Sequence, residues 1–277
     1  MKTYKMILTN ILFAAAALIA GGCDSLEGDN SDFDFENSAK AEDPARLPDT
    51  YRLATYNTHR CSPAKTNNAN YDNTARAISL IDADVIALQE LDRNTRVFPA
   101  DQIGELAKRT GLHPVFCKTI NYSGGEYGIG MLCRKEPIRT DSEELPGVET
   151  RRFLVAEFDD FVYICTHLCV ASEDNRSWSF DIINEYVDNH YASSSKPVFI
   201  AGDMNTSVLP ASASTHWKVI SASTPTFPSK STRIDYILSY TGNSAPYIVE
   251  RTFVPVYPDF RIADVSDHLP VIVDLKK

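Results

Sequence analysis

The residues best suited to chemistry in this sequence lie in the stretch 199–205, FIAGDMN. The short apolar run FIA is typical of a buried strand, and it leads into Gly-Asp-x-Asn. In extended backbone, residues two apart point to the same side, so Asp203 and Asn205 would lie together at the mouth of the strand. A carboxylate beside an amide can orient a water molecule and a phosphate oxygen. The same four residues also suit a turn, so their meaning depends on the rest of the chain.

Other apolar runs in the chain end or begin at similar polar groups. These positions are Asn57, Glu90, His167 and the pair Asp267 and His268. Asp235 stands inside the run RIDYIL, where an ionised carboxylate is strongly destabilising unless it is paired. Asp235 and His268 can satisfy each other, which would give an oriented imidazole. Each residue alone fits a structural role, such as a turn asparagine or a surface carboxylate, but together they predict one polar site.

The elements that must position these residues alternate irregularly along the chain. Apolar runs predict strands at 51–56, 84–88, 127–133, 153–158, 161–165, 198–201, 234–238, 247–253 and 271–275. Helical spacing and helix-end signals predict helices at 71–82, 101–110 and 173–191. Many strands with few helices between them indicate a sheet-rich α/β domain with two packed sheets and outer helices, rather than a doubly wound fold.

The order of the motifs resembles the endonuclease/exonuclease/phosphatase superfamily, which includes deoxyribonuclease I. The resemblance covers residues 50–277 and rests on six motifs: TYN at 55–57, ALQE at 87–90, THL at 166–168, GDMN at 202–205, IDYI at 234–237 and SDHLP at 266–270. It implies a four-layer sandwich, in which two packed mixed β-sheets are flanked by helices and the site lies at one end. Asp101-Gln102 and the GGEYG stretch at 124–128 resemble the superfamily's bacterial hydrolases.

The resemblance also implies roles for these residues. Three would hold Mg²⁺ or Mn²⁺ or support its water: Glu90, Asn57 and Asp267. Hard cations take oxygen ligands, and Mg²⁺ keeps several waters, so one or two carboxylates suffice. Four would orient the attacking water or contact the phosphate: Asp203, Asn205, His268 and His167. Asp235 would orient His268, and His167 could instead assist the leaving oxygen. Either Asp203 or His268 could be the general base. Arg151 could bind the phosphate or be a solvated strand end.

Residues 1–22 are predicted to be a signal peptide, because two lysines precede a short apolar run that ends in small residues. The run is too short to span a bilayer comfortably. Gly21-Gly22-Cys23 resembles a bacterial lipobox, with Ala20 where that pattern prefers Leu, and predicts that Cys23 is lipidated. The alternative is an ordinary cleaved signal peptide with an incidental cysteine.

Residues 23–49 are predicted to be the lipidated cysteine followed by an acidic, disordered tether, because nine acidic residues stand there with few apolar ones. This segment carries most of the formal net charge of −10. In the remaining domain, 50–277, basic residues are scattered, which disfavours a binder of long nucleic acid duplexes. Of the six cysteines, an odd number remains after Cys23, so a complete set of intrachain disulfides is excluded.

We therefore predict an exported, Mg²⁺- or Mn²⁺-dependent phosphoester hydrolase. It would be a monomer without an evident protein partner, held by lipid on Cys23 at the outer membrane or cell surface. The mild acidity of the domain slightly favours a small or lipid-borne phosphoester over nucleic acid as substrate. Two alternatives stay open: an extracellular nuclease of the same superfamily, and a non-catalytic surface-binding module that keeps the fold.

Overall fold

The computed structural model describes residues 44–63, 66 and 68–276. The predicted signal peptide, Cys23 and the acidic segment up to residue 43 lie outside the described residues. Residues 44–49 lie against the domain, because the Arg52 guanidinium donates to the carbonyls of Pro44 and Ala45. Within the described residues, no helix is both long enough and apolar enough to cross a membrane.

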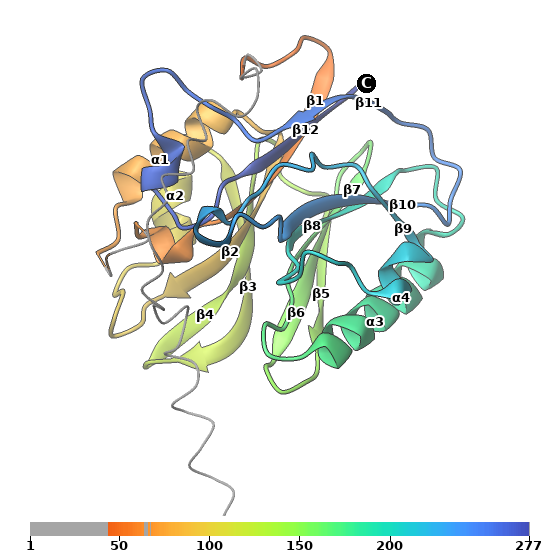
Figure 1. Cartoon of the computed structure of the whole chain (residues 1–277), viewed down its shortest axis with the longest axis horizontal. Helices are drawn as coiled ribbons and strands as arrows, with labels where there is room; N and C mark the ends of the chain where they lie inside the picture. Colours follow the sequence, from red (N-terminus) through yellow and green to blue (C-terminus); the bar gives the residue numbers. More distant parts are fainter. Residues whose placement is uncertain (1–43, 64–65, 67, 277) are drawn as a thin grey trace, which may run out of the picture. The chain divides into compact units, whose positions relative to one another are not determined.

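The first of two mixed sheets in the described part of the chain has six strands in the order β11-β12-β1-β2-β4-β3 (Figure 1). Its strands are β1 (Thr50–Asn57), β2 (Val85–Arg93), β3 (His113–Tyr122), β4 (Gly125–Cys133), β11 (Ile248–Phe253) and β12 (Val271–Lys276). β1 and β2 run parallel, whereas β12 runs antiparallel to β1. The end of β1 therefore lies at the same edge as the start of β12.

The second sheet also has six strands among the described residues, in the order β5-β6-β7-β8-β10-β9. Its strands are β5 (Arg139–Leu145), β6 (Arg151–Glu157), β7 (Val162–His167), β8 (Val198–Asp203), β9 (Trp217–Val219) and β10 (Asp235–Tyr240). β7 and β8 run parallel, and β10 runs antiparallel to β8. The ends of β7 and β8 and the start of β10 thus share one edge.

Helices cover the outer faces of the two sheets, with α1 and α2 on the first and α3 and α4 on the second (Figure 1). The helices are α1 (Tyr71–Ile81), α2 (Gln102–Thr110), α3 (Glu173–Tyr191) and α4 (Ala211–Ser214), with the 3₁₀ turns η1 (His59–Cys61), η2 (Pro228–Lys230) and η3 (Ile262–Asp264). Buried side chains from both sheets, such as Leu53 and Phe199, share one apolar cluster, and separate clusters lie under the helices. The predicted four-layer sandwich is confirmed.

The three predicted helices are present, and so are the nine predicted strands, with shifted ends. β3, β5 and β9 were not predicted. β3 and β5 are edge strands with mostly half-buried or exposed residues, so they lack the apolar run by which a strand is recognised. The buried face of α3 carries Phe180 and Ile183, whereas Trp178 of the same helix is 56% exposed. Trp217, the other tryptophan, is buried.

Candidate active site

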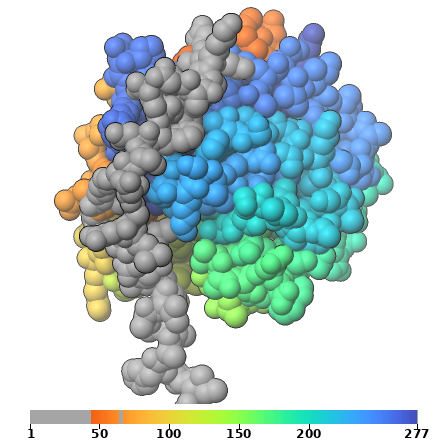
Figure 2. Space-filling view, viewed as in Figure 1, coloured from red at the N-terminus to blue at the C-terminus, as the bar shows by residue number. Residues whose placement is uncertain are grey.

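Strand direction brings the predicted polar residues to one end of the two sheets. Asn57, His167 and Asp203 are the last residues of β1, β7 and β8, and Asp235 is the first residue of β10. His268 stands in the loop before β12. Figure 2 shows the chain in space-filling form from the side of Figure 1, with the light-blue segment that precedes β10 near the centre of the view. The two sheets meet directly here, because the Asn57 side chain in one donates to Asp203 in the other.

Asp203 lies at the centre of the site. Nitrogen atoms of three side chains surround its Oδ2: Asn57 Nδ2 at 3.1 Å, His167 Nε2 at 3.5 Å and His268 Nε2 at 3.7 Å. Its Oδ1 accepts a hydrogen bond of 2.8 Å from the backbone N–H of Asn205. The two histidine distances are longer than ordinary hydrogen bonds. The Nε2 atoms of His167 and His268 can therefore still donate to an oxygen atom of a bound ligand.

Close packing of β7 against β8 fixes the position of the Asp203 carboxylate. Gly202 precedes it with φ of 151°, and a Cβ atom there would lie 1.9 Å from the carbonyl oxygen of Thr166. Only glycine allows this approach. The backbone that comes close here is that of Thr166 on β7.

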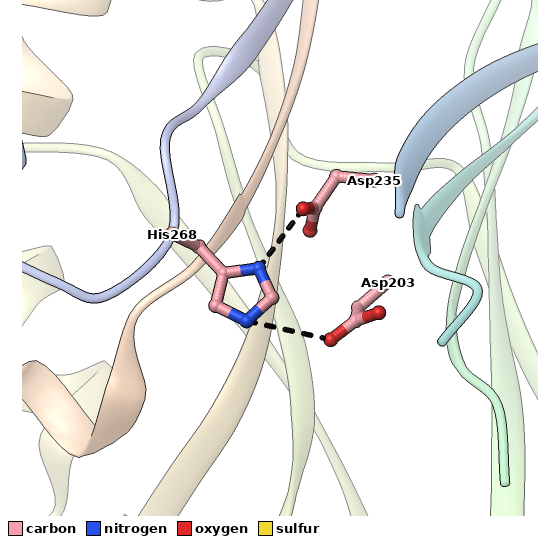
Figure 3. A group of neighbouring side chains, drawn as sticks. All are labelled: Asp203, Asp235 and His268. Atoms are coloured by element: carbon pink, nitrogen blue, oxygen red, sulfur yellow. Dashed lines mark hydrogen bonds and ion pairs between the residues drawn. The ribbon is translucent and has the colours of Figure 1, made fainter. Parts of the chain in front are cut away.

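His268 is held between two carboxylates (Figure 3). Its Nδ1 lies 2.9 Å from Asp235 Oδ2, so the contact expected from the sequence is present. Thr226 supports this pair: its hydroxyl accepts from the backbone N–H of Asp235, and its carbonyl accepts from that of Leu269. The Phe227 ring lies 4.8 Å from the imidazole, centroid to centroid. Asp235 Oδ1 is buried without a hydrogen-bond partner.

Burial and the neighbouring charges shift the pKa values of Asp203 and His268. Burial raises the pKa of Asp203 to about 7, and the Asp235 charge acts in the same direction, against His268 and Asn57. Burial would lower the pKa of His268, but Asp235, through its charge and hydrogen bond, and Asp203 raise that pKa to about 10. At neutral pH, His268 is therefore a cationic donor, whereas Asp203 changes protonation near neutrality. Of the two predicted candidates for the base, the geometry and charges favour Asp203.

His167 has a fixed tautomer. Arg151 Nη1 lies 3.2 Å from His167 Nδ1, and a guanidinium can only donate, so Nδ1 must accept. The hydrogen is therefore on Nε2, which faces Asp203. Burial lowers the pKa of His167 well below its ordinary value, and the charges of Arg151 and His268 act in the same direction. His167 is thus a neutral hydrogen-bond donor. Arg151, which is 13% exposed and also pairs with Glu149, is not a solvated strand end.

Glu90 lies at a bulge rather than at a strand end. The register of β2 against β4 shifts between Leu88 and Leu91, and Glu90 adopts a φ of 59°. A left-handed non-glycine residue at a bulge is typical of a functional site. The Glu90 carboxylate accepts from Asn57 Nδ2 at 3.2 Å. Because the backbone N–H of His59 donates to Asn57 Oδ1, the Asn57 amide presents its donor to both carboxylates.

Glu90 and Asp267 could hold a divalent cation. Burial raises the pKa of Asp267, and the Glu90 charge adds to this, while His268 and His59 oppose it. Two partly buried carboxylates that repel each other supply the oxygen ligands that Mg²⁺ or Mn²⁺ takes, so these residues fit such an ion. Asp203, Asp235 and His268 also place ligand atoms within 4.8 Å of one another. In this group, His268 Nδ1 is already engaged by the Asp235 carboxylate.

The structure adds residues that sequence reasoning missed. Ser266 donates from its hydroxyl to the Asn57 carbonyl and accepts from the His268 N–H, which fixes the loop before β12. Asn205 donates from Nδ2 to the Leu168 carbonyl, a contact that the sequence did not indicate. The serine could have been found from its place in the SDHLP motif. The other contacts depend on backbone atoms that are distant in sequence.

Comparison with known proteins agrees with this geometry. A sequence model of the endonuclease/exonuclease/phosphatase family matches residues 54–268. The chain belongs to the endonuclease/exonuclease/phosphatase family. The match begins within β1 and ends at His268, so it includes every residue of the site described above. No curated protein sequence matches significantly.

Solved structures of this family share the fold. An endonuclease/exonuclease/phosphatase protein from Beutenbergia cavernae is 22% identical with a TM-score of 0.66, over 82% of this chain and 71% of that one. A mannosyl-6-phosphatase from Bacteroides thetaiotaomicron is 17% identical with a TM-score of 0.60, over 81% and 99%. The human Nocturnin catalytic domain with bound sulfate is 17% identical with a TM-score of 0.60, over 82% and 93%. These identities establish the fold alone.

Proposed function

We propose that this protein is a divalent-metal-dependent hydrolase of phosphoesters, with a small or lipid-borne phosphoester as substrate. The main support for this proposal is that side-chain nitrogen atoms of Asn57, His167 and His268 surround Asp203 Oδ2. A buried carboxylate with a raised pKa, facing two histidine donors, suits a water molecule on one side and a phosphate oxygen on the other.

Each side chain has a role that follows from its protonation state. Asp203 orients the attacking water and accepts its proton. His268, cationic and held by Asp235, donates to a phosphate oxygen as negative charge develops. His167 donates from Nε2 to a second phosphate oxygen. The second hydrogen of Asn205 Nδ2 remains for a further contact with the phosphate.

Hydrolysis forms one P–O bond to water and breaks the ester P–O bond, so that the alcohol leaves. His167 does not supply the proton to the leaving oxygen, because it would become an anionic imidazolate; solvent water supplies it. A divalent ion at Glu90 and Asp267 supplies charge stabilisation and orientation when it is bound. Asn57, which donates to both Glu90 and Asp203, keeps this ion site and the water site in register.

The family contains enzymes with different substrates. The mannosyl-6-phosphatase acts, by its name, on a sugar phosphate, and Nocturnin was solved with a sulfate anion. Both support an anion site in this fold and agree with a small phosphoester here. A surface-binding module without activity would not need the buried Asp235–His268 pair, whose formation leaves one carboxylate oxygen without a partner.

Metal titration of wild type and Glu90→Gln tests the proposal. Glutamine keeps the size of the side chain but removes the charge. We expect Mg²⁺ and Mn²⁺ to bind the wild type in calorimetry and to support phosphate release. In Glu90→Gln, the metal affinity and the rate of phosphate release should each fall at least tenfold. Asp188→Asn, at an exposed position of α3, is the matched control and should behave as wild type. Equal metal binding and equal rates in Glu90→Gln would overturn the proposed metal site.

We also propose that the enzyme is exported and anchored by lipid on Cys23 at the outer membrane or cell surface. Support comes from the Gly-Gly-Cys sequence after a short apolar run. Radiolabelled palmitate should be incorporated into the wild type and not into Cys23→Ser. Incorporation that is equal in both would exclude the cysteine anchor. Gel filtration of the purified chain would test whether it is a monomer.

A further inference from the structure

A strained turn lies beside the site and is not used by the proposed reaction. Three successive non-glycine residues of η1, His59, Arg60 and Cys61, have φ angles of 46°, 58° and 57°. Such residues are strained and persist only where the surrounding structure holds them. The buried Gln102 holds this turn: its Nε2 donates to the Arg60 carbonyl and its Oε1 accepts from the Asp92 N–H.

The strained turn presents Arg60 in a clamped position. Its Nε lies 3.4 Å from Asp92 Oδ2, and the Asp92 side chain is fully buried. The guanidinium carbon lies 5.3 Å from the centre of the Tyr122 ring and 5.5 Å from that of Tyr127. Two cation–π contacts and a buried carboxylate thus fix the side chain. Among the described residues, none accepts a hydrogen bond from this guanidinium, and its buried Nε pairs with Asp92 by charge alone.

Arg60 lies on the Glu90 side of the site. Its partner Asp92 stands two residues after Glu90 on β2, and the Glu90 charge acts to raise the pKa of Arg60. Asn57 Nδ2 lies within 3.2 Å of Glu90 and within 3.1 Å of Asp203. Contacts therefore lead from Asp203 through Asn57 to Glu90, and Arg60 pairs with Asp92, which lies beyond Glu90 along β2.

Phosphoester hydrolysis places the attacking water and the leaving oxygen roughly in line on opposite sides of phosphorus. If water is held by Asp203, the leaving oxygen lies toward Glu90 and the alcohol part of the substrate lies beyond it. We propose that Arg60 binds a second anionic group, a phosphate or a carboxylate, carried by that alcohol part. This inference rests on the proposed hydrolase function and names the class of substrate.

The chemistry of the arginine agrees with this assignment. A planar guanidinium matches the oxygens of a phosphate or carboxylate in a two-pronged contact. Arg60 is 24% exposed, so a ligand can reach its terminal nitrogens. It takes no part in bond making: water adds to phosphorus, the ester P–O bond breaks, and the alcohol leaves with its second anionic group still attached. A purely structural arginine would serve only to neutralise Asp92.

An anion-binding role and a purely structural role for Arg60 predict different substrate preferences. The test compares kcat/KM of the full chain on two matched pairs, glucose 6-phosphate against glucose 1,6-bisphosphate and glycerol 3-phosphate against 3-phosphoglycerate. We expect the wild type to prefer the doubly anionic member of at least one pair. Arg60→Gln should lower that preference about ten- to one-hundred-fold, as expected for a charged hydrogen bond. Arg60→Lys should keep part of it, because the charge remains but the two-pronged contact is lost.

Arg93→Gln is the matched control. Arg93 also pairs with a carboxylate, that of Glu126, and stacks on an aromatic ring, that of Phe116, but it lies beyond the bulge. Its loss should leave the preference unchanged. Salt provides a test without mutation, since the wild-type preference should fall as sodium chloride is added.

Two results would overturn the Arg60 assignment while the hydrolase function stands. One is that Arg60→Gln lowers kcat/KM equally for both members of both pairs, which would indicate a purely structural role for the arginine. The other is a wild type that shows no preference in either pair at any salt concentration. If the wild type releases no phosphate from any of the four substrates or from p-nitrophenyl phosphate with Mg²⁺ or Mn²⁺, the proposed function itself fails.

Discussion

Charged side chains are buried near both ends of β1, but the two groups differ in how completely they are paired. Near its start, Arg52 Nε lies 2.7 Å from Asp274 Oδ1, both side chains are fully buried, and Arg251 Nε lies 2.7 Å from the other carboxylate oxygen. Near its end, Asp235 keeps a buried oxygen without a partner, and two histidines face Asp203 at 3.5 and 3.7 Å.

The pKa directions show the same contrast. At the start of β1, burial would raise the pKa of Asp274, but hydrogen bonds and charges from Arg52 and Arg251 lower it. At the end of β1, burial and the Asp235 charge raise the pKa of Asp203 to about 7. A buried charge therefore does not by itself mark a functional site. A buried charge that lacks some of its partners does mark a functional site, because a substrate, a water molecule or a cation can supply the missing contacts.

The largest expected effect is on turnover and is produced by Asp203→Asn. The amide cannot accept the proton of the attacking water, so kcat/KM should fall about 10²–10⁴-fold. The free energy of unfolding at pH above 7, without divalent metal, should stay equal or rise, because the substitution removes a buried charge. Steady-state kinetics and urea unfolding of the same preparation measure both. An unfolded variant would show that Asp203 serves the fold.

Asp274→Asn should give the opposite pattern. It leaves the Arg52 guanidinium buried without its charged partner, so the free energy of unfolding should fall by about 3–5 kcal/mol. The kcat/KM of the folded fraction should not change, because the pair lies away from the site. Urea unfolding and kinetics below the transition check this. A loss of kcat/KM in fully folded protein would break the distinction between the two ends.

His167 offers a finer test, since its neutral donor role differs from that of a general acid. Glutamine also has one acceptor for Arg151 and one donor for the phosphate, whereas alanine has neither. We expect His167→Gln to lose about tenfold in kcat and His167→Ala about 10²-fold or more. Equal losses in the two variants would show that the imidazole itself transfers a proton.

The smallest effect is a pH dependence of stability. The lowered pKa of Asp274 means that its contribution is complete above the unfolded value of about 3.9 and is lost as the pH falls through the folded value. The difference in unfolding free energy between wild type and Asp274→Asn should therefore shrink toward low pH. Urea titrations across the acid range measure this. A difference that stays constant would mean that the carboxylate charge is not what stabilises the pair.

Much of this arrangement could be predicted from the sequence where the signal is local. Apolar runs that end in polar residues located Asn57, His167 and Asp203, and the unfavourable burial of Asp235 in an apolar run predicted its contact with His268. The edge strands β3 and β5 could not be found in this way, because one face of each is open to solvent and their sequences lack apolar runs.

Long-range contacts account for what the sequence did not reveal. The bulge that places Glu90 arises from the register between β2 and β4, not from its own residues. Arg60 followed the TYN motif without any evident role, because its position depends on a left-handed turn and on the distant Gln102. The pairs of Asp92 with Arg60 and of Arg93 with Glu126 were likewise not indicated by the sequence.

The most direct test of the central claim is hydrolysis of p-nitrophenyl phosphate and bis-p-nitrophenyl phosphate by the full chain. Each substrate would be assayed with Mg²⁺, with Mn²⁺ and with EDTA, in wild type and in Asp203→Asn. Our account predicts metal-dependent release of nitrophenol that EDTA stops and Asp203→Asn nearly abolishes, with the ratio of diester to monoester rates defining the bond cleaved. Release that persists in EDTA, or at the same rate in Asp203→Asn, would contradict it.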